Sequence, residues 1–377
     1  MESKLRQMKY YIIAGEASGD LHGANLMKEL FKQDLQADIR FWGGDLMEKA
    51  GGTLVKHYRD LAFMGFAEVV QNLSTILNNI KFCKQDITAF NPDVLIFIDY
   101  PGFNMRIAEW AKKLDYKTHY YISPQIWAWK ENRIKAIKRD VDHMYIILPF
   151  EKDFYENKHN FKVEFVGHPL IDAIHNRTHT NEVAFRKEHN LDDRPVIALL
   201  PGSRKQEISK MLSGMLSVVN DFPDYQFVIA GAPSQEYSFY EQFLGSSSVK
   251  FISNKTYDLL SIAHAALVTS GTATLETALF KVPEVVCYKG NWISYQIAKR
   301  VVTLKYISLV NLILDKEIVK ELIQENFNTK NIRAELQKIL TPEYRLNLLK
   351  QYDLLEEKLG GFGASEKTAN LIIKHLT

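Results

Sequence analysis

Cysteine, net charge and long apolar runs are all scarce in this 377-residue chain, and each scarcity argues against a class of protein. The only cysteines, Cys83 and Cys287, lie far apart in the sequence, so they form neither a disulfide framework nor a metal-ligand pair, which indicates a reducing compartment. The 47 basic and 45 acidic side chains leave a formal net charge of +2. That balance argues against a dedicated nucleic-acid-binding protein, which would concentrate positive charge over a whole domain.

The sequence also lacks a secretion signal and a membrane span. The apolar stretch Tyr10–Ala14 is too short for a signal peptide and soon meets Glu16 and Asp20. No run approaches the roughly 18 apolar residues that a membrane-spanning helix needs. We therefore expect a cytoplasmic protein, which can still touch a membrane surface.

Short apolar runs alternate with helical patterns along the chain, which is typical of βαβ units around a parallel sheet. The length exceeds the roughly 250–300 residues at which a single core stops growing, which predicts two domains. Helices are predicted between the strands, for example at 23–32 and 105–114. The predicted strands are 10–14, 39–42, 94–98, 118–122, 143–147 and 163–166 in the first half, and 196–200, 226–230, 249–252, 266–269 and 285–288 in the second.

The polar segment His175–Arg194 reads as the connection between two doubly wound α/β halves. We expect an N-terminal domain over 1–175, a second domain over 176–345, and helices over 346–377 that pack back on the first domain or on a partner subunit. The tail from Ile318 onward is predicted to be mostly helical. Each half should bind ligands beyond the carboxyl ends of its strands, so a facing pair would form a central cleft.

Two loops in the first half carry carboxylates directly after predicted strands. Gly15–Asp20 contains Glu16, Ser18 and Gly19, and its carboxylates suit sugar hydroxyls better than a phosphate. The alternative is a tight turn with a helix cap. Asp99 follows the strand at 94–98, where it can accept a proton from an attacking hydroxyl. Alternatively, Asp99 caps the helix that begins after Pro101.

Two loops in the second half suit a nucleotide diphosphate, because glycines and helix N-termini present N–H donors to phosphate. In the first, Gly202 and Ser203 precede Arg204, which can grip a diphosphate with its guanidinium, or else form a surface salt bridge. In the second, Glu276 falls one turn into a helix and can accept both ribose hydroxyls, although a plain capping box has the same pattern. This second loop begins with Ser270, Gly271 and Thr272.

Apolar residues between 61 and 80 recur at spacings of three and four, which predicts an amphipathic helix. The helix either packs on its own sheet or offers an apolar patch to a bilayer or an acyl chain. The aromatic and basic run from Trp127 to Arg139 would suit anionic lipid headgroups, although an ordinary solvated helix face explains it equally well. The proposed acceptor- or lipid-facing side chains of the apolar helix are Phe63, Met64, Phe66, Val69, Val70 and Leu73.

A metal-binding Asp-x-Asp motif is mimicked by Asp140 and Asp142, but this pair precedes a predicted strand and so lies at the wrong end of the sheet. We expect no essential metal there.

Several blocks together resemble the lipid-A-disaccharide synthase family. They are GEASGD at 15–20, PQIWAW at 124–129, LPFE at 148–151, FVGHP at 165–169, LLPGSR at 199–204, SGTATLE at 270–276 and VKELIQE at 319–325. The resemblance implies a GT-B fold, no tightly bound cofactor, and an inverting transfer from UDP-2,3-diacylglucosamine to 2,3-diacylglucosamine 1-phosphate (lipid X). It further implies peripheral binding to the inner face of the inner membrane of Gram-negative bacteria. The sequence leaves the oligomeric state open, with a homodimer as one alternative.

Carried over by motif, Asn311 joins Arg204, Ser270, Gly271, Thr272 and Glu276 at the UDP site, and Asp99 or Asp20 serves the acceptor. Two positions depart from the family pattern. Gly102 stands where some members have a second aspartate, which leaves the general base open among Asp99, Asp20 and Glu16. Val310 replaces the usual proline before Asn311.

Rival interpretations remain at this point. An isomerase like UDP-N-acetylglucosamine 2-epimerase has the same double architecture and nucleotide site, but it needs no second sugar and no lipid-binding face. A non-catalytic sugar-binding protein is usually exported. A nucleic-acid-binding module would show a steep salt dependence.

Overall fold

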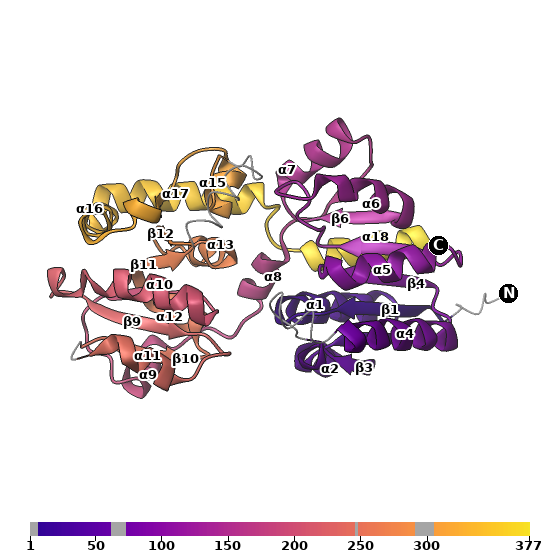
Figure 1. The fold of residues 1–377 in the computed structure, drawn as a ribbon, viewed down its shortest axis with the longest axis horizontal. Helices are drawn as coiled ribbons and strands as arrows, with labels where there is room; N and C mark the ends of the chain where they lie inside the picture. The colour runs from indigo at the N-terminus through magenta and orange to yellow at the C-terminus, as the bar shows by residue number, and fades with distance from the viewer. Residues whose placement is uncertain (1–6, 62–72, 246–247, 291–304) are drawn as a thin grey trace. The chain divides into compact units, whose positions relative to one another are not determined.

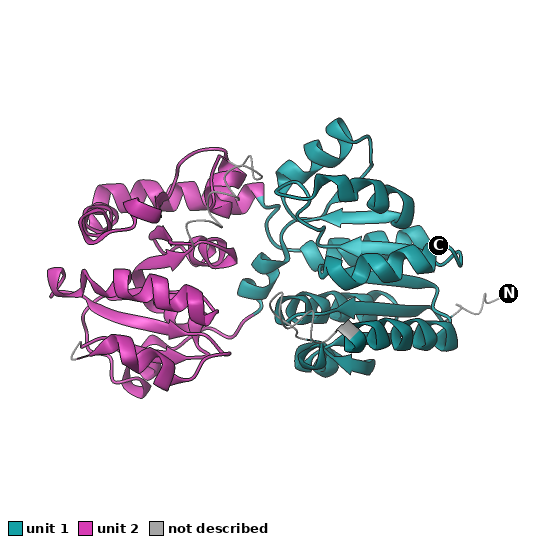
Figure 2. Ribbon diagram, in the orientation of Figure 1, with its two compact units in different colours: residues 1–176, 359–377 teal, residues 177–358 magenta. Residues whose placement is uncertain are grey.

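Two parallel β-sheets organise the chain. The computed structural model describes residues 7–61, 73–245, 248–290 and 305–377, and it divides into unit 1 (residues 1–176 and 359–377) and unit 2 (residues 177–358) (Figure 2). The segment predicted over 346–377 is divided between the two units. Helix α17, Pro342–Lys358, belongs to unit 2, and the chain rejoins unit 1 at Leu359.

Unit 1 contains a seven-stranded sheet in the order β3-β2-β1-β4-β5-β6-β7 (Figure 1). Its strands are β1 (Lys9–Ala14), β2 (Asp38–Gly43), β3 (Thr53–His57), β4 (Val94–Ile98), β5 (Thr118–Tyr121), β6 (His143–Ile146) and β7 (Glu164–Phe165). Its helices are α1 (Ala17–Gln33), α2 (Asp45–Ala50), α4 (Leu73–Phe90), α5 (Pro101–Lys112), α6 (Ile134–Asp140), α7 (Pro149–Lys152), α8 (Pro169–His175) and α18 (Ala364–Leu376).

Unit 2 contains a six-stranded sheet in the order β10-β9-β8-β11-β12-β13. Its strands are β8 (Val196–Leu200), β9 (Gln226–Gly231), β10 (Lys250–Ser253), β11 (Ala263–Thr269), β12 (Glu284–Tyr288) and β13 (Lys320–Ile323). Its helices are α9 (Glu182–Glu188), α10 (Lys205–Leu216), α11 (Tyr237–Leu244), α12 (Thr256–Ile262), α13 (Thr272–Leu279), α15 (Leu309–Leu314), α16 (Thr329–Leu340) and α17.

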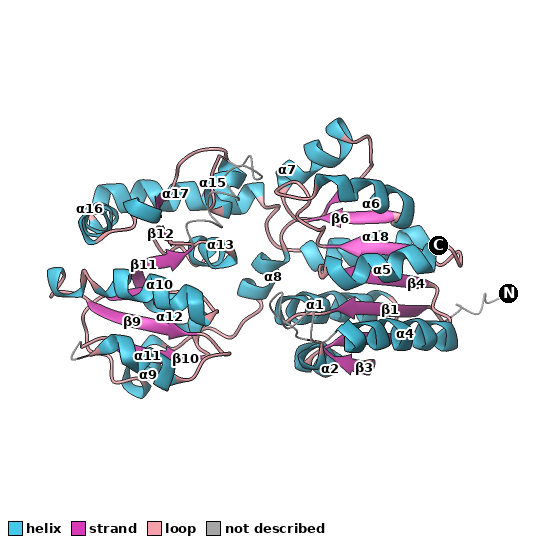
Figure 3. Ribbon diagram, in the orientation of Figure 1, coloured by secondary structure: helices cyan, strands magenta, loops and turns pink. Residues whose placement is uncertain are grey.

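Helices cover both faces of each sheet, as Figure 3 shows. Central strands such as β4 and β8 are buried along their whole length, which is why they read as continuous apolar runs in the sequence. In β1, Tyr11 and Ile13 join the core formed with α4, α5 and α6. The alternate residues Tyr10 and Ile12 are equally buried and point to the opposite face.

The central strands were predicted correctly, but two edge strands were missed. β3 was not predicted, and neither was β13, which pairs in parallel with β12. The rest of the tail is mostly helical, as predicted, and forms α16, α17 and α18. The sequence of β13, Lys-Glu-Leu-Ile, is half polar, so only its pairing reveals the strand.

The C-terminal segment is tied into unit 1 by the FVGHP block. The His168 backbone N–H donates to the Leu359 carbonyl over 2.9 Å, and Gly167, at φ +95°, lets the Gly360 backbone approach. The Asp172 carboxylate then accepts N–H bonds from Gly363 (2.8 Å) and Ser365 (2.7 Å) at the start of α18. The FVGHP block and Asp172, three residues after it, therefore hold the returning chain against unit 1.

Candidate functional site

The loops after β1 and β4 are brought together by the strand order of unit 1. These strands pair in parallel, with Ala14 opposite Ile98, at the point where the order of the sheet reverses. In open α/β sheets ligands bind outside the carboxyl ends of the strands at such a point. The Gly15–Asp20 loop and the Asp99–Asn104 loop therefore share one edge of the sheet.

Asp99 is held in an unusual backbone conformation. Asp99 and Tyr100 both have positive φ, 44° and 49°, which costs about 1–3 kcal/mol for each non-glycine residue. The Asp99 carbonyl accepts bonds from the Asn104 side chain (2.7 Å) and the Tyr120 hydroxyl (2.6 Å), which hold it there. Tyr100, not Asp99, occupies the N-cap position of α5, so Asp99 is not the helix cap.

The Asp99 carboxyl has the electrostatic character of a general base. Burial raises its pKa to about 6, the negative charge of Glu16 adds to the rise, and the Tyr100 backbone N–H opposes it. A base works best with a pKa close to the operating pH. Glu16 is exposed at the N-cap position of α1. Asp99 and Glu16, two of the three candidate carboxylates, therefore influence each other through their charges.

Asp20, the third candidate, has a structural task instead. It is buried, and its carboxylate accepts backbone N–H bonds from Gly44 (2.7 Å), Met47 (3.0 Å) and Leu46 (3.1 Å) at the start of α2. Its oxygens are therefore committed to these three backbone donors. Of the two small residues in this loop, Ser18 is exposed and Gly19 is buried, where a Cβ would press on Ala14.

The space around Gly102, where some family members have a second aspartate, is unfilled. A Cβ at Gly102 would meet nothing within 4 Å, so packing does not require glycine there.

Most of the apolar helix predicted over 61–80 lies outside the described residues. Phe63, Met64, Phe66, Val69 and Val70 lie outside the described residues, and Leu73 is the first residue of α4. In the described remainder, Leu61 and Ile80 are buried in the core of unit 1, whereas Leu77 is 52% exposed.

In unit 2 the same topology joins the other two loops. β8 and β11 pair at the reversal of strand order, with Leu200 opposite Val268, and the loops that follow them border a hollow of about 480 Å³. Its lining includes seven of the eight predicted nucleotide residues, namely Gly202, Ser203, Arg204, Ser270, Gly271, Thr272 and Glu276.

The lining of this hollow offers donors and one cation. Gly202 and Gly271 have positive φ, +106° and +153°, which glycine adopts without strain. Arg204 is exposed at the N-cap position of α10 and makes no ion pair with any residue that the structure describes, which removes the salt-bridge alternative within that part of the chain. Glu207 was missed by the sequence analysis; its carboxylate accepts the Ser203 N–H over 3.0 Å and so braces the loop.

Asn311 is the eighth predicted nucleotide residue, and it does not line the hollow. It is fully buried: its amide donates to the Val319 carbonyl and to Glu321, and accepts from the Ile318 and Val319 N–H groups. Glu321 also accepts the Ile307 N–H, and the Ile307 carbonyl accepts the Ser270 hydroxyl over 3.1 Å. Asn311 thus supports Ser270 indirectly, through Glu321 and Ile307.

Glu151 organises the PQIWAW block, a role that the sequence did not reveal. This buried carboxyl accepts bonds from the Ser123 hydroxyl and the Trp127 indole N–H, and from the Leu148 backbone N–H over 3.0 Å. Burial raises its pKa to about 7. It ties the loop after β5 to the loop after β6.

Among the described residues, one group has the spacing of a metal site: His143, Glu164 and His375, half-buried in unit 1. The two imidazole rings are stacked, with centroids 3.7 Å apart and planes 15° from parallel. Their in-plane lone pairs therefore run side by side and do not converge on one ion. Asp142, from the Asp-x-Asp decoy, accepts the Thr118 N–H over 3.0 Å at the amino end of β5.

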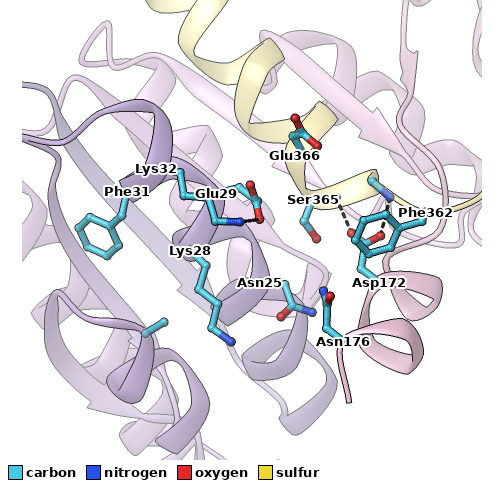
Figure 4. Close-up of a pocket in the computed structure, with 12 residues that line it drawn as sticks. Asn25, Lys28, Glu29, Phe31, Lys32, Asp172, Asn176, Phe362, Ser365 and Glu366 are labelled. Atoms are coloured by element: carbon cyan, nitrogen blue, oxygen red, sulfur yellow. Dashed lines mark hydrogen bonds and ion pairs between the residues drawn. The ribbon is translucent and has the colours of Figure 1, made fainter. Parts of the chain in front are cut away.

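Unit 1 also has a polar hollow of about 660 Å³ between α1, α8 and the start of α18 (Figure 4). Its charges are largely matched: Lys32 pairs with Glu29 over 2.6 Å, and Asp172 is occupied by the α18 backbone. None of the residues predicted for the acceptor or the nucleotide lines this hollow.

Residues 10–372 match the sequence model of a family described as lipid-A-disaccharide synthetase. The chain is 38% identical over 379 residues to a lipid-A-disaccharide synthase of Syntrophus aciditrophicus, covering 98% of this chain and 97% of that protein. It is 36% identical over 373 residues to a lipid-A-disaccharide synthase of Geobacter sulfurreducens, covering 97% and 96%.

Solved structures show similarity at the level of the fold. A UDP-GlcNAc 2-epimerase from Neisseria meningitidis, bound to UDP-GlcNAc, has a TM-score of 0.69 at 15% identity over 97% of this chain and 100% of that one. The glycosyltransferase of kitacinnamycin has a TM-score of 0.66 at 14% identity over 99% and 100%. The predicted GT-B fold class, with two Rossmann-like α/β units, is confirmed. Among the described residues, no helix has the length and apolar character needed to cross a bilayer.

Proposed function

The chain belongs to the lipid-A-disaccharide synthase family of glycosyltransferases, and we propose that it joins UDP-2,3-diacylglucosamine to 2,3-diacylglucosamine 1-phosphate. The products would be UDP and a β-1,6-linked disaccharide 1-phosphate. The epimerase alternative is not favoured, since its similarity is one of fold at 15% identity, whereas the named synthases are 36–38% identical over nearly the whole chain.

The observation that carries this proposal is the hollow of unit 2. Two glycine turns, the starts of α10 and α13, and the guanidinium of Arg204, which forms no ion pair with a described residue, border one space of about 480 Å³. N–H groups at helix N-termini and a guanidinium are the groups that stabilise phosphate oxygens. We assign this hollow to the UDP part of the donor, where it would stabilise the negative charge that develops as UDP departs.

The proposed reaction is a single displacement. The acceptor 6-hydroxyl oxygen forms a bond to the anomeric carbon as the bond from that carbon to the diphosphate oxygen breaks, through an oxocarbenium-like transition state. Asp99 takes the hydroxyl proton, and the electron pair of the broken bond leaves with UDP. Attack from the side opposite the leaving group inverts the anomeric configuration. The mechanism requires Asp99, at the acceptor hydroxyl, and Arg204, at the diphosphate of the donor, to serve the same transfer.

Asp99 is preferred over Glu16 and Asp20 as the base. Its support is the raised pKa of about 6 and the strained backbone that holds it at the end of β4. Asp20 is committed to three N–H donors. Glu16 would assist through its charge, which favours the protonated form of Asp99 after the transfer.

Both proposed substrates carry acyl chains, so the enzyme must meet them at or near a lipid surface. We extend the proposal to peripheral binding at the cytoplasmic face of the inner membrane. Of the side chains proposed for that contact, Phe63, Met64, Phe66, Val69 and Val70 lie outside the described part of the chain, and Leu73 begins α4. Flotation of the purified protein with anionic and neutral vesicles tests this point separately from activity.

Incubation of the protein with both diacylated substrates, followed by mass spectrometry of the lipid fraction, tests the proposed function. We expect a disaccharide 1-phosphate and one UDP for each product molecule, and no UDP release without the acceptor. If UDP-GlcNAc alone is converted to its 2-epimer and no disaccharide forms, the isomerase reading replaces ours.

A further inference from the structure

Tyr257 forms a hydrogen bond to the proposed ribose ligand, Glu276. Tyr257 lies in the first turn of α12, which follows β10, and Glu276 lies in α13, which follows β11. The Tyr257 hydroxyl donates to Glu276 Oε1 over 2.7 Å. Because the two residues come from different strand-to-helix turns, the bond depends on the folded unit and no sequence pattern predicts it.

The electrostatics of the pair define its donor and acceptor. Burial raises the pKa of Tyr257, and the charge of Glu276 raises it further, so the hydroxyl keeps its proton at neutral pH. Burial also raises the pKa of Glu276, and the bond from Tyr257 opposes that rise. Tyr257 therefore helps to keep Glu276 ionised and able to accept further hydrogen bonds.

Tyr257 is itself held in place. Its ring packs against Phe280, with centroids 5.2 Å apart and planes at 52°. Its backbone carbonyl accepts the Ser261 hydroxyl over 2.7 Å. Arg177 anchors the same helix: its guanidinium bonds to Asp258 and Ser261, each over 2.7 Å, and lies 5.4 Å from the centre of the Phe280 ring.

We propose that Tyr257 is a positioning residue that fixes the Glu276 carboxylate for the ribose hydroxyls, and thereby sets a preference for ribonucleotides over 2′-deoxyribonucleotides. This inference rests on the proposed function, in which the hollow of unit 2 takes a UDP-sugar. Glu276 lines that hollow, so its carboxylate is within reach of a bound ligand.

The physical reason is preorganisation. A carboxylate offers about four lone-pair positions, so one bond from Tyr257 leaves enough acceptors for two neighbouring hydroxyls. Without that bond, the Glu276 side chain can rotate, and its ordering must be supplied when the nucleotide binds. Because the preference for ribose depends on acceptance of the 2′-hydroxyl, misplacement of Glu276 weakens UDP binding more than binding of 2′-deoxy-UDP.

The test is calorimetric titration of UDP and 2′-deoxy-UDP into the wild type, Tyr257→Phe, Glu276→Gln and a matched control. Tyr257→Phe keeps the ring that packs on Phe280. The control is Tyr10→Phe in unit 1, which loses a similar bond from a buried tyrosine to a carboxylate, the 3.0 Å bond to Asp34. Thermal melts of each variant verify folding.

We expect wild type and Tyr10→Phe to prefer UDP by about tenfold or more, the worth of a hydrogen bond to a charged group. Glu276→Gln should lose most of that preference, and in Tyr257→Phe the ratio of UDP affinity to 2′-deoxy-UDP affinity should fall by about threefold or more. In Tyr257→Phe, UDP affinity should also begin to fall at a higher pH than in wild type as the solution is acidified, because Glu276 loses the donor that favours its charge.

The outcomes distinguish a failure of the ribose role of Glu276 from a failure of the positioning role of Tyr257. If Glu276→Gln binds UDP and 2′-deoxy-UDP as the wild type does, the ribose role of Glu276 in the proposed function fails. If Glu276→Gln loses the preference while a folded Tyr257→Phe keeps both it and the wild-type pH profile, the positioning role of Tyr257 is overturned and the nucleotide site stands.

Discussion

Gly15 and Tyr100 fit together so closely that a side chain at position 15 would have to displace the Tyr100 ring: an added Cβ would lie closer than 3.0 Å to three atoms of that ring. The two residues belong to the loops after β1 and β4, and Tyr100 follows Asp99 directly. The first glycine loop is therefore shaped by the loop that carries the proposed base.

Gly15→Ala should lower both activity and stability. The methyl group must displace the Tyr100 ring, and overpacking of this kind costs about 1–3 kcal/mol. Because Tyr100 adjoins Asp99, we expect turnover to fall further than the loss of folded protein explains. Turnover per folded molecule, with the folded fraction taken from a denaturant melt, checks this. Gly102→Ala is the matched control, since a Cβ there meets nothing within 4 Å; equal losses in both variants would contradict the coupling.

Asp99→Asn should lower turnover by about 10²–10⁴-fold, the usual contribution of a general base, with UDP affinity nearly unchanged. In the wild type the base must be ionised, so kcat/KM should rise with pH through the Asp99 pKa of about 6. Glu16→Gln removes a charge that raises this pKa, so the rise should shift to lower pH. Initial rates from pH 5 to 8 measure both effects. Near-normal turnover of Asp99→Asn would refute the assignment.

Arg204→Ala should weaken both UDP binding and turnover. Loss of hydrogen bonds between a guanidinium and a phosphate costs about 1.5–3 kcal/mol, or roughly 10–150-fold in affinity. Lys205→Ala removes the neighbouring exposed cation and serves as the control for general charge. UDP titrations at low and moderate ionic strength distinguish the two variants, and an equal effect of both would mean that Arg204 has no specific role.

Asp172→Ala should loosen the C-terminal segment. The carboxylate accepts N–H bonds from Gly363, Ala364 and Ser365 at the start of α18. Loss of a helix cap costs about 0.5–2 kcal/mol, and this one is buried, so we expect the upper end of that range. Limited proteolysis should cut the variant near the glycines at 360–363 before other sites. The cap of α9, Asn181, is surface-exposed, and Asn181→Ala should show no such cleavage.

The sequence predicted the central strands and the loops after them because their signals are local: a buried apolar run, then glycine and polar residues. Asp20 is an example of a residue whose role depends on contacts that are distant in the sequence. In the sequence it looks as catalytic as Asp99, and only the fold brings it to the N–H groups of Gly44 and Met47. The Tyr257–Glu276 bond and the Asn311–Glu321 bond likewise join separate elements. Sequence patterns therefore locate the site, whereas tertiary partners decide which of its polar residues remain available for chemistry.

The buried carboxyl of Glu284 gives a prediction about stability alone. It begins β12, is 0% exposed, and neither of its oxygens has a hydrogen-bond partner among the residues that the structure describes. Burial raises its pKa well above the usual range, so it folds in the protonated form. An acid whose pKa is higher in the folded state stabilises the fold least at high pH, because the unfolded chain gains the ionised form. Stability should therefore fall as pH rises between the unfolded and folded pKa values.

Glu284→Gln is neutral at every pH and removes this dependence. We expect the variant to gain about 1–2 kcal/mol over the wild type at pH 8, seen as a melting temperature several degrees higher, and to differ little at pH 5. The control Glu343→Gln changes an exposed carboxylate on α17 and should leave the profile unaltered. Melting curves from pH 5 to 9 decide the matter: a constant difference between Glu284→Gln and wild type across this range would show that Glu284 has the same protonation state in the folded and the unfolded chain, which contradicts the prediction. Turnover should remain unchanged, because Glu284 is at the amino end of β12, whereas the proposed nucleotide loops follow the carboxyl ends of β8 and β11.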